Sequence, residues 1–175
     1  MGRLGRGSND RACVFSAENS PHHTFDIHPQ GHILAAHMLG DIYHWGQGVA
    51  IDYPRAMAAY KVAAEAGDAV SQHQVGFVYC TGPGVAVDYK QARPWLEKAA
   101  AQDFPDAIGQ LGGMYFEGKG VAPSWRRARE LYERSIELGN SVAVTNMQTL
   151  TRSIANVTTS GNPPHTNQIH PHTCK

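Results

Sequence analysis

Histidine is the residue type in this sequence with the widest range of possible chemistry, because the chain contains ten of them. Imidazole nitrogens are common zinc ligands, and they also act as general bases near neutral pH. Most of the histidines lie near the ends of the chain. The clearest metal-binding candidates are His165, His170, His172 and Cys174 near the end, and His22, His23, His28 and His32 near the start. Their spacing fits no zinc module, and ordering a flexible tail around an ion would cost entropy, so we expect no metal site.

Catalytic patterns are also missing from the sequence. No Gly-x-Ser-x-Gly elbow or Cys–His signature is present, although nucleophilic catalysis needs an activated nucleophile beside an oriented base. Gly46-x-Gly48 follows a predicted helix and recurs three times, which is typical of a structural turn and not of a phosphate loop. We therefore expect a non-enzymatic protein without catalytic residues or a cofactor. The alternative is a metal-binding protein or hydrolase that uses the histidines.

Composition limits the possible partners. The 15 basic residues balance the 15 acidic ones, so no net charge attracts the chain to nucleic acid or to an anionic membrane. We find no apolar run of the ~20 residues that span a bilayer, and no apolar core of a signal peptide, which favours a cytoplasmic protein. Three widely spaced cysteines do not suggest a disulfide framework. The partner expected is a protein or peptide, and the sequence leaves the oligomeric state open.

A repeat with a constant step of 36 residues organises the middle of the chain. Gly40 is followed at this step by Gly76 and then by Gly112, and no gap is needed to keep the register. The same step links Tyr43, Tyr79 and Tyr115; Gly46, Gly82 and Gly118; Gly48, Gly84 and Gly120; and Ala56, Ala92 and Ala128. Fixed periods of this length are typical of solenoid proteins.

Each copy predicts two helices, here named helix A and helix B. In the first copy, Ala35, Leu39 and Tyr43 recur at helical spacing, and the glycine pair then ends helix A. Asp52 and its equivalents Asp88 and Ser124 can cap helix B. One hairpin cannot bury its own apolar face, so the copies should stack into a curved solenoid with a concave side. The predicted fold class is all-α, an α-solenoid (superhelix) of three stacked αα-hairpin repeats plus a C-terminal capping helix.

The predicted boundaries follow from the repeat and from the composition of its flanks. The repeats cover about 32–67, 68–103 and 104–139, and a more polar capping helix covers 140–155, because Ala143 and Met147 continue the helix-A pattern. Residues 1–31 and the His/Pro-rich residues 156–175 lack any period and are predicted to be disordered.

The repeat resembles the Sel-1-like repeat, a relative of the tetratricopeptide repeat. The residues that carry the resemblance are Leu39-Gly40-x-x-Tyr43-x-x-Gly46-x-Gly48-Val49-x-x-Asp52-x-x-x-Ala56-x-x-x-Tyr60-x-x-Ala63-Ala64-x-x-Gly67. The departures are Asp103 for the closing glycine, Ser124 for Asp, and Ser135-Ile136 for Ala-Ala. The resemblance implies a non-enzymatic adaptor or scaffold that assembles other proteins. A cysteine-rich bacterial branch is associated with β-lactam binding or hydrolysis, but these repeats contain only Cys80, so that activity is not supported.

A partner-binding face is predicted on helix A. If positions 35, 39, 40 and 43 form the buried stripe, the opposite face is free for a partner and mixes aromatic with polar residues. The predicted partner-binding residues are His37, Asp41, His44, Trp45, His73, Gln74, Phe77, Gln110 and Phe116. The alternative interpretation is that Trp45, Phe77 and Phe116 merely pack against neighbouring helices.

Overall fold

The computed structural model describes residues 33–160, and it contains helices and no strands within that range. The helices are α1 (Ile33–Trp45), α2 (Tyr53–Glu65), α3 (Ala69–Thr81), α4 (Tyr89–Ala100), α5 (Pro105–Glu117), α6 (Trp125–Glu137) and α7 (Ser141–Ser160). The predicted all-α class is confirmed. The segment predicted to be disordered at the start lies outside the described residues, as do residues 161–175.

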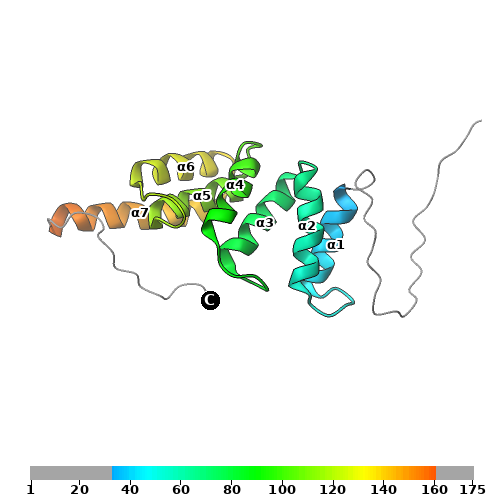
Figure 1. Cartoon of the computed structure of the whole chain (residues 1–175). Helices are drawn as coiled ribbons and strands as arrows, with labels where there is room; N and C mark the ends of the chain where they lie inside the picture. Colours follow the sequence, from blue (N-terminus) through cyan, green and yellow to red (C-terminus); the bar gives the residue numbers. More distant parts are fainter. Residues whose placement is uncertain (1–32, 161–175) are drawn as a thin grey trace, which may run out of the picture.

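The helices pair as the 36-residue step predicts. α1 packs with α2, α3 with α4 and α5 with α6, and each hairpin stacks on the next, with α7 packed on α6 at the far end (Figure 1). The solenoid architecture is therefore confirmed. α7 is longer than expected, because it continues through residues 156–160, which were assigned to the tail. The prediction gave too much weight to the prolines of the tail, the first of which is Pro163 and lies beyond the end of the helix.

The turn between helices A and B repeats in detail. Gly82 and Gly118 end α3 and α5 in the left-handed conformation, with φ of 79° and 71°. A backbone amide then donates to the carbonyl of the helix-A tyrosine across each turn: Asp52 to Tyr43 at 2.9 Å, Asp88 to Tyr79 at 2.9 Å, and Ser124 to Tyr115 at 2.8 Å. The side chains of the same three residues cap helix B, as predicted, by accepting hydrogen bonds from amides of its first turn.

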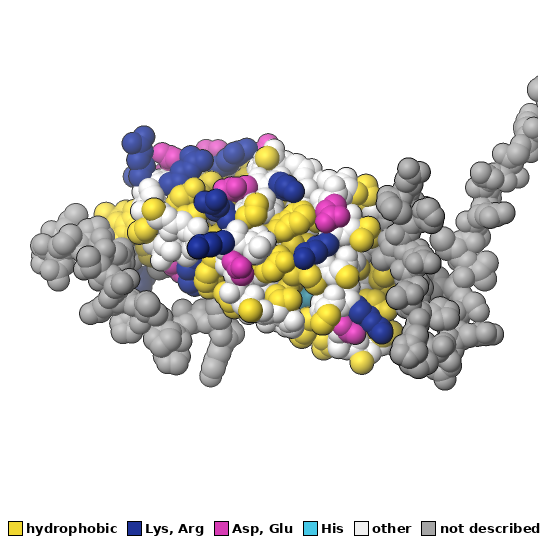
Figure 2. Space-filling model, in the orientation of Figure 1, with side chains coloured by type: hydrophobic (Ala, Val, Ile, Leu, Met, Phe, Trp, Pro, Cys, Tyr) yellow, Lys and Arg dark blue, Asp and Glu magenta, His cyan; other side chains and the backbone are white. Residues whose placement is uncertain are grey.

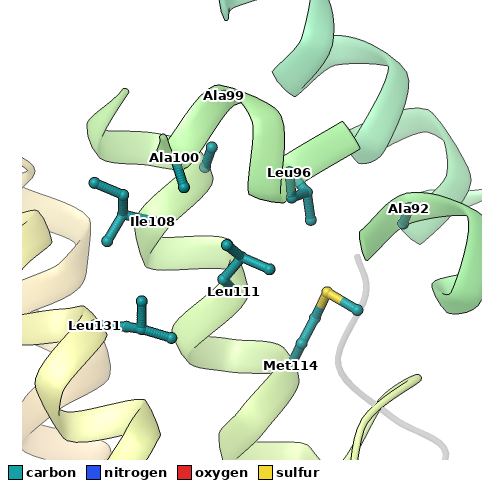
Figure 3. Packing of buried hydrophobic residues seen from close by; sticks show 9 residues of the cluster. Ala92, Leu96, Ala99, Ala100, Ile108, Leu111, Met114 and Leu131 are labelled. Atoms are coloured by element: carbon teal, nitrogen blue, oxygen red, sulfur yellow. The ribbon is translucent and has the colours of Figure 1, made fainter. Parts of the chain in front are cut away.

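The core lies between successive repeats as well as within them. One cluster joins Tyr60 and Ala64 of α2 to Val75 and Val78 of α3. The next joins α4, α5 and α6, and Figure 3 shows members from α4 and α5 facing one another while Leu131 enters from α6. The last cluster joins α6 to Ala143 and Leu150 of α7. Each helix B therefore covers the following helix A, which is the stacking that a single hairpin needs.

The buried stripe predicted for helix A is correct in α3 and α5 but wrong in part of α1. Val75 and Leu111 are buried, as expected, whereas the equivalent Leu39 is half-buried and Ala35 is exposed. α1 buries Gly40 of the predicted stripe, together with Ala36 and His44, which lie outside it. The physical reason is that no helix precedes α1 within the described residues, so one side of it has no neighbour to pack against.

Candidate protein-binding surface

Several helix-A side chains on the side predicted to be free for a partner are exposed or half-buried. Two of their positions recur at the 36-residue step, one at Leu34 and Val70 and the other at Met38, Gln74 and Gln110. We name them the helix-A surface, which consists of Leu34, Met38 and Trp45 of α1, Val70, Gln74 and Phe77 of α3, and Gln110 of α5. Four apolar members are exposed: Leu34 by 69%, Met38 by 53%, Trp45 by 63% and Val70 by 38%. Exposed apolar side chains in one region are a usual mark of a binding site.

Four of the residues predicted for partner binding lie on this surface. Trp45 is largely exposed, while Gln74, Phe77 and Gln110 are half-buried. The side-chain oxygen of Gln110 is buried without a hydrogen-bond partner. Burying such a group without a hydrogen bond costs free energy.

His37 lies at the junction between the first two repeats. Its Nδ1 is 2.9 Å from the Ser71 hydroxyl of α3, and its Nε2 is 3.3 Å from a carboxylate oxygen of Asp41. Asp41 also accepts a hydrogen bond from the Tyr60 hydroxyl at 2.7 Å. Burial, followed by the Asp41 carboxylate, raises the pKa of Tyr60 above its usual range. His37 and Asp41 therefore tie α1 to α2 and α3 before any partner is considered.

Ser71, His37 and Asp41 together form a serine–histidine–carboxylate chain, a set that elsewhere performs acyl transfer. A nucleophilic hydroxyl must reach the substrate, but Ser71 is completely buried. Its backbone amide donates to Asp68 at 2.7 Å in the first turn of α3. The arrangement therefore connects two repeats, and its geometry does not offer the hydroxyl to a substrate.

His44 and His73, the other two histidines predicted to bind a partner, are also packed against side chains of this chain. His44 is only 9% exposed and contacts the rings of Trp45, Tyr53 and Tyr60, with centroids 4.6, 5.5 and 6.1 Å away. His73 lies against Phe104 with a centroid distance of 5.1 Å. Burial lowers the pKa of both histidines, and neighbouring carboxylates oppose this shift. The expectation of an open helix face is wrong at His44, because the following helix B covers that position.

Phe116 belongs to a packing contact. Its ring centroid is 6.3 Å from that of Trp125, and it packs against the cluster that joins α6 to α7. The alternative interpretation, in which these aromatics pack against neighbouring helices, thus describes the position of Phe116. It does not describe that of Trp45.

Sequence reasoning places positions 34 and 38 on the open face of helix A, but it did not select Leu34, Met38 or Val70 as partner-binding residues. A usable signal was present, since Leu34 and Val70 occupy equivalent positions 36 residues apart and neither lies on the stripe that packs against helix B. Histidines and aromatic residues were selected instead, because their chemistry is more distinctive than that of aliphatic side chains.

The described residues contain no group of three or more His, Cys, Asp or Glu side chains placed to hold a metal ion. His165, His170, His172 and Cys174 lie outside those residues, as do His22, His23, His28 and His32. None of the helices between residues 33 and 160 is both long and apolar enough to cross a membrane.

Three consecutive segments, residues 33–68, 69–104 and 105–140, match the family model of the Sel1 repeat. Each begins one residue after the boundary expected from the sequence. Among curated proteins, no match to the chain was found.

Solved structures resemble the fold. A Sel1 repeat protein from Oxalobacter formigenes is 33% identical, with a TM-score of 0.60, over 67% of this chain and 88% of that one. A protective antigen of uropathogenic Escherichia coli strains, displaying an SLR fold, is 33% identical with a TM-score of 0.65, over 75% of this chain and 27% of the antigen. Cysteine rich protein B of Helicobacter pylori is 21% identical with a TM-score of 0.55, over 65% of this chain and 88% of that chain, which shows a shared fold.

Proposed function

The chain belongs to the Sel1 repeat family, and we propose that it is a non-enzymatic adaptor that binds a peptide or protein partner along its helix-A surface. Proteins of this family are generally protein-interaction scaffolds. The observation that carries the proposal is the exposure of Leu34, Met38 and Trp45 on one side of α1, by 53% or more of each residue.

The outer side of helix B has a different character. On α6, Arg126 and Arg127 pair with Glu130, and Arg129 pairs with Glu133 at 2.8 Å. Figure 2 shows positive and negative side chains gathered over α6. Charges that already satisfy one another in water gain little from a partner, whereas exposed apolar side chains gain free energy when they are covered.

The helix-A surface favours a partner that combines apolar side chains with hydrogen-bond donors. Apolar members dominate on α1, while Gln74 and Gln110 supply amide groups further along the stack. A peptide lying across α1, α3 and α5 would meet both kinds of contact.

Capture of partners from an extract of the source cells tests the proposal. The immobilised full chain is compared with a Trp45→Ala, Val70→Glu variant, in which both changed residues are exposed, so the fold should tolerate them. The matched control is Ala58→Glu, Gln91→Ala, on exposed positions of α2 and α4. We expect a partner that the chain and the control retain but that the surface variant loses at least about tenfold, a change of ~1.4 kcal/mol. Equal capture by both variants would refute the proposed surface.

A further inference from the structure

No described residue covers the side of α1 that faces away from α3, whereas the equivalent sides of α3 and α5 are covered. Position 35 corresponds to Ser71 and Ala107, both completely buried, yet Ala35 is exposed. Leu39 is half-buried, whereas Val75 and Leu111 at the same position are 0% and 4% exposed. Ile42 is half-buried, whereas Val78 and Met114 are 2% and 3% exposed.

The surroundings of the second glycine of the turn show the same difference between the first repeat and the later ones. A Cβ atom on Gly84 would lie 2.5 Å from Cβ of Tyr53, and one on Gly120 would lie 2.7 Å from Cβ of Tyr89. In both cases the neighbour is the first residue of the preceding helix B. A Cβ atom on Gly48 would meet nothing within 4 Å. Within residues 33–160, the position that a preceding helix B would fill is therefore open at the first repeat.

We infer that this open stacking face, formed by Ala35, Leu39, Ile42 and Val49, binds a helix of the helix-B type supplied by another protein. The expected chemistry of that helix follows from α2 and α4, which cover the following helix A with a large residue between small ones. In α2 these are Ala56, Tyr60 and Ala64, spaced four residues apart on one side of the helix. The face thus continues an interface that the molecule already builds between its own repeats.

Helices of this chain are poor candidates for the occupant. α2, α4 and α6 are each packed against the next helix A or against α7, so a second copy has no unused helix B among its described residues. Residues 16–31 stand one period before α2, but they include Pro21 and Pro29, and Thr24 stands where Tyr60 does. A proline inside a helix removes a backbone hydrogen bond and clashes with the preceding turn. α4 accommodates one such residue at Pro94, whereas residues 16–31 contain two prolines and also lack a large side chain at the Tyr60 position. The helix is therefore expected from a different chain.

The inference is independent of the helix-A surface, since none of the four residues of the open stacking face belongs to it. The probe is a synthetic peptide of residues 52–67, the sequence that covers α3, held helical by a hydrocarbon link between positions 58 and 65, both exposed in α2. Its control peptide carries Tyr60→Glu. The full chain is titrated with each peptide by fluorescence anisotropy, beside an Ala35→Glu variant and an Ala58→Glu control, both at exposed positions.

We expect saturable 1:1 binding of the helical peptide to the full chain and to the Ala58→Glu control. Affinity should fall at least about tenfold for the Tyr60→Glu peptide and for the Ala35→Glu chain, as expected when a charge is buried without a partner. Absence of binding, or binding that Ala35→Glu leaves unchanged, would overturn the inference. So would a dimer in sedimentation that Ala35→Glu disperses, which assigns the face to a second copy. A Phe25→Asp chain, changed within residues 16–31, that binds the peptide more tightly would also overturn it, by assigning the face to the chain's own leading residues.

Discussion

Gly112 of α5 lies directly against the ring of Tyr132 of α6, so that a Cβ atom on the glycine would come within 2.7 Å of the ring carbon Cδ1. A Cβ atom added to Gly40 would likewise lie 2.4 Å from the ring of Tyr60, and one added to Gly76 would lie 2.7 Å from the side chain of Leu96. In every hairpin, the helix-A glycine thus sets how closely helix B approaches. The large side chain opposite it is completely or almost completely buried, and it also contributes to the contact with the next repeat.

Gly112→Ala should destabilise the protein by about 2 kcal/mol. The added methyl group overlaps the buried Tyr132 ring, and overpacking of this kind costs ~1–3 kcal/mol. The better helix propensity of alanine offsets roughly 1 kcal/mol of that cost at most. The free energy of unfolding from urea denaturation measures the effect.

Its neighbour Gly113 provides the control in the same helix. A Cβ atom there would be 3.7 Å from the Tyr132 hydroxyl, an ordinary contact. Gly113→Ala should therefore stabilise the protein by about 0.5–1 kcal/mol through helix propensity alone. Equal effects of the two substitutions would show that the close approach at Gly112 does not limit the packing.

Asp103→Gly should raise the free energy of unfolding by about 0.5 kcal/mol. Asp103 has a positive φ of 58°, where the equivalent residues are Gly67 and Gly139 with φ of 102° and 92°. Glycine adopts this conformation without strain. The substitution would also remove the ion pair with Arg134, but both side chains of that pair are exposed, so the pair contributes little to stability. The reverse change, Gly139→Asp, should destabilise, and a thermal melt in which both variants shift the same way would contradict this explanation.

Pro94→Ala should stabilise α4 by about 1 kcal/mol or more. The helix runs from Tyr89 to Ala100 through this exposed proline, which cannot donate the backbone hydrogen bond that the fourth preceding carbonyl would accept. Ala58 occupies the same position in α2 and is also exposed. Ala58→Pro should cost about 3 kcal/mol. Chemical denaturation of both variants measures this, and a neutral Ala58→Pro would refute the reasoning.

His73→Gln should weaken the dependence of stability on pH. Burial holds the pKa of His73 in the folded protein below its ordinary value of 6.5, although Asp106 opposes the shift. The unfolded chain therefore binds the proton first on acidification, so the free energy of unfolding falls as the pH drops from about 7 to about 5. Above about pH 7 the histidine is neutral in both states, and it adds no pH dependence there.

The measurement compares thermal melts of the chain and of the His73→Gln variant across that pH range. His44 has its pKa shifted in the same direction, so the variant should retain part of the fall in stability. An unchanged pH dependence would mean that burial of His73 does not affect its protonation.

The fold could be predicted from the sequence because its period is set by residues with one conformational role. Gly82 and Gly118 require a left-handed backbone, and Asp52, Asp88 and Ser124 require helix starts, so their constant spacing defines the hairpins. Residues 156–160 were assigned wrongly because composition does not mark where a helix ends when no breaker is present.

The candidate surface was only partly predictable, because the helical wheel of one helix does not include the next repeat. His44 and His73 lie on the side that the wheel leaves open, yet neighbouring helices cover them. Ala35 shows the opposite error, since a position that is buried in α3 and α5 is exposed in α1, the first helix of the part of the chain that the structure describes. Burial at a repeat boundary depends on which neighbours are present, and that information is not contained in the period.

The central claim is that the partner covers the helix-A surface, and hydroxyl-radical footprinting of the full chain with and without its captured partner tests it most directly. The internal standard is a pair of exposed apolar residues that are not members of that surface: Val87 and Leu138, exposed by 50% and 40%. We predict that the partner slows the oxidation of Met38, Trp45 and Val70 at least about threefold, and that it leaves the standard residues unchanged. Protection of Val87 or Leu138 without protection of Met38 and Trp45 would contradict the account.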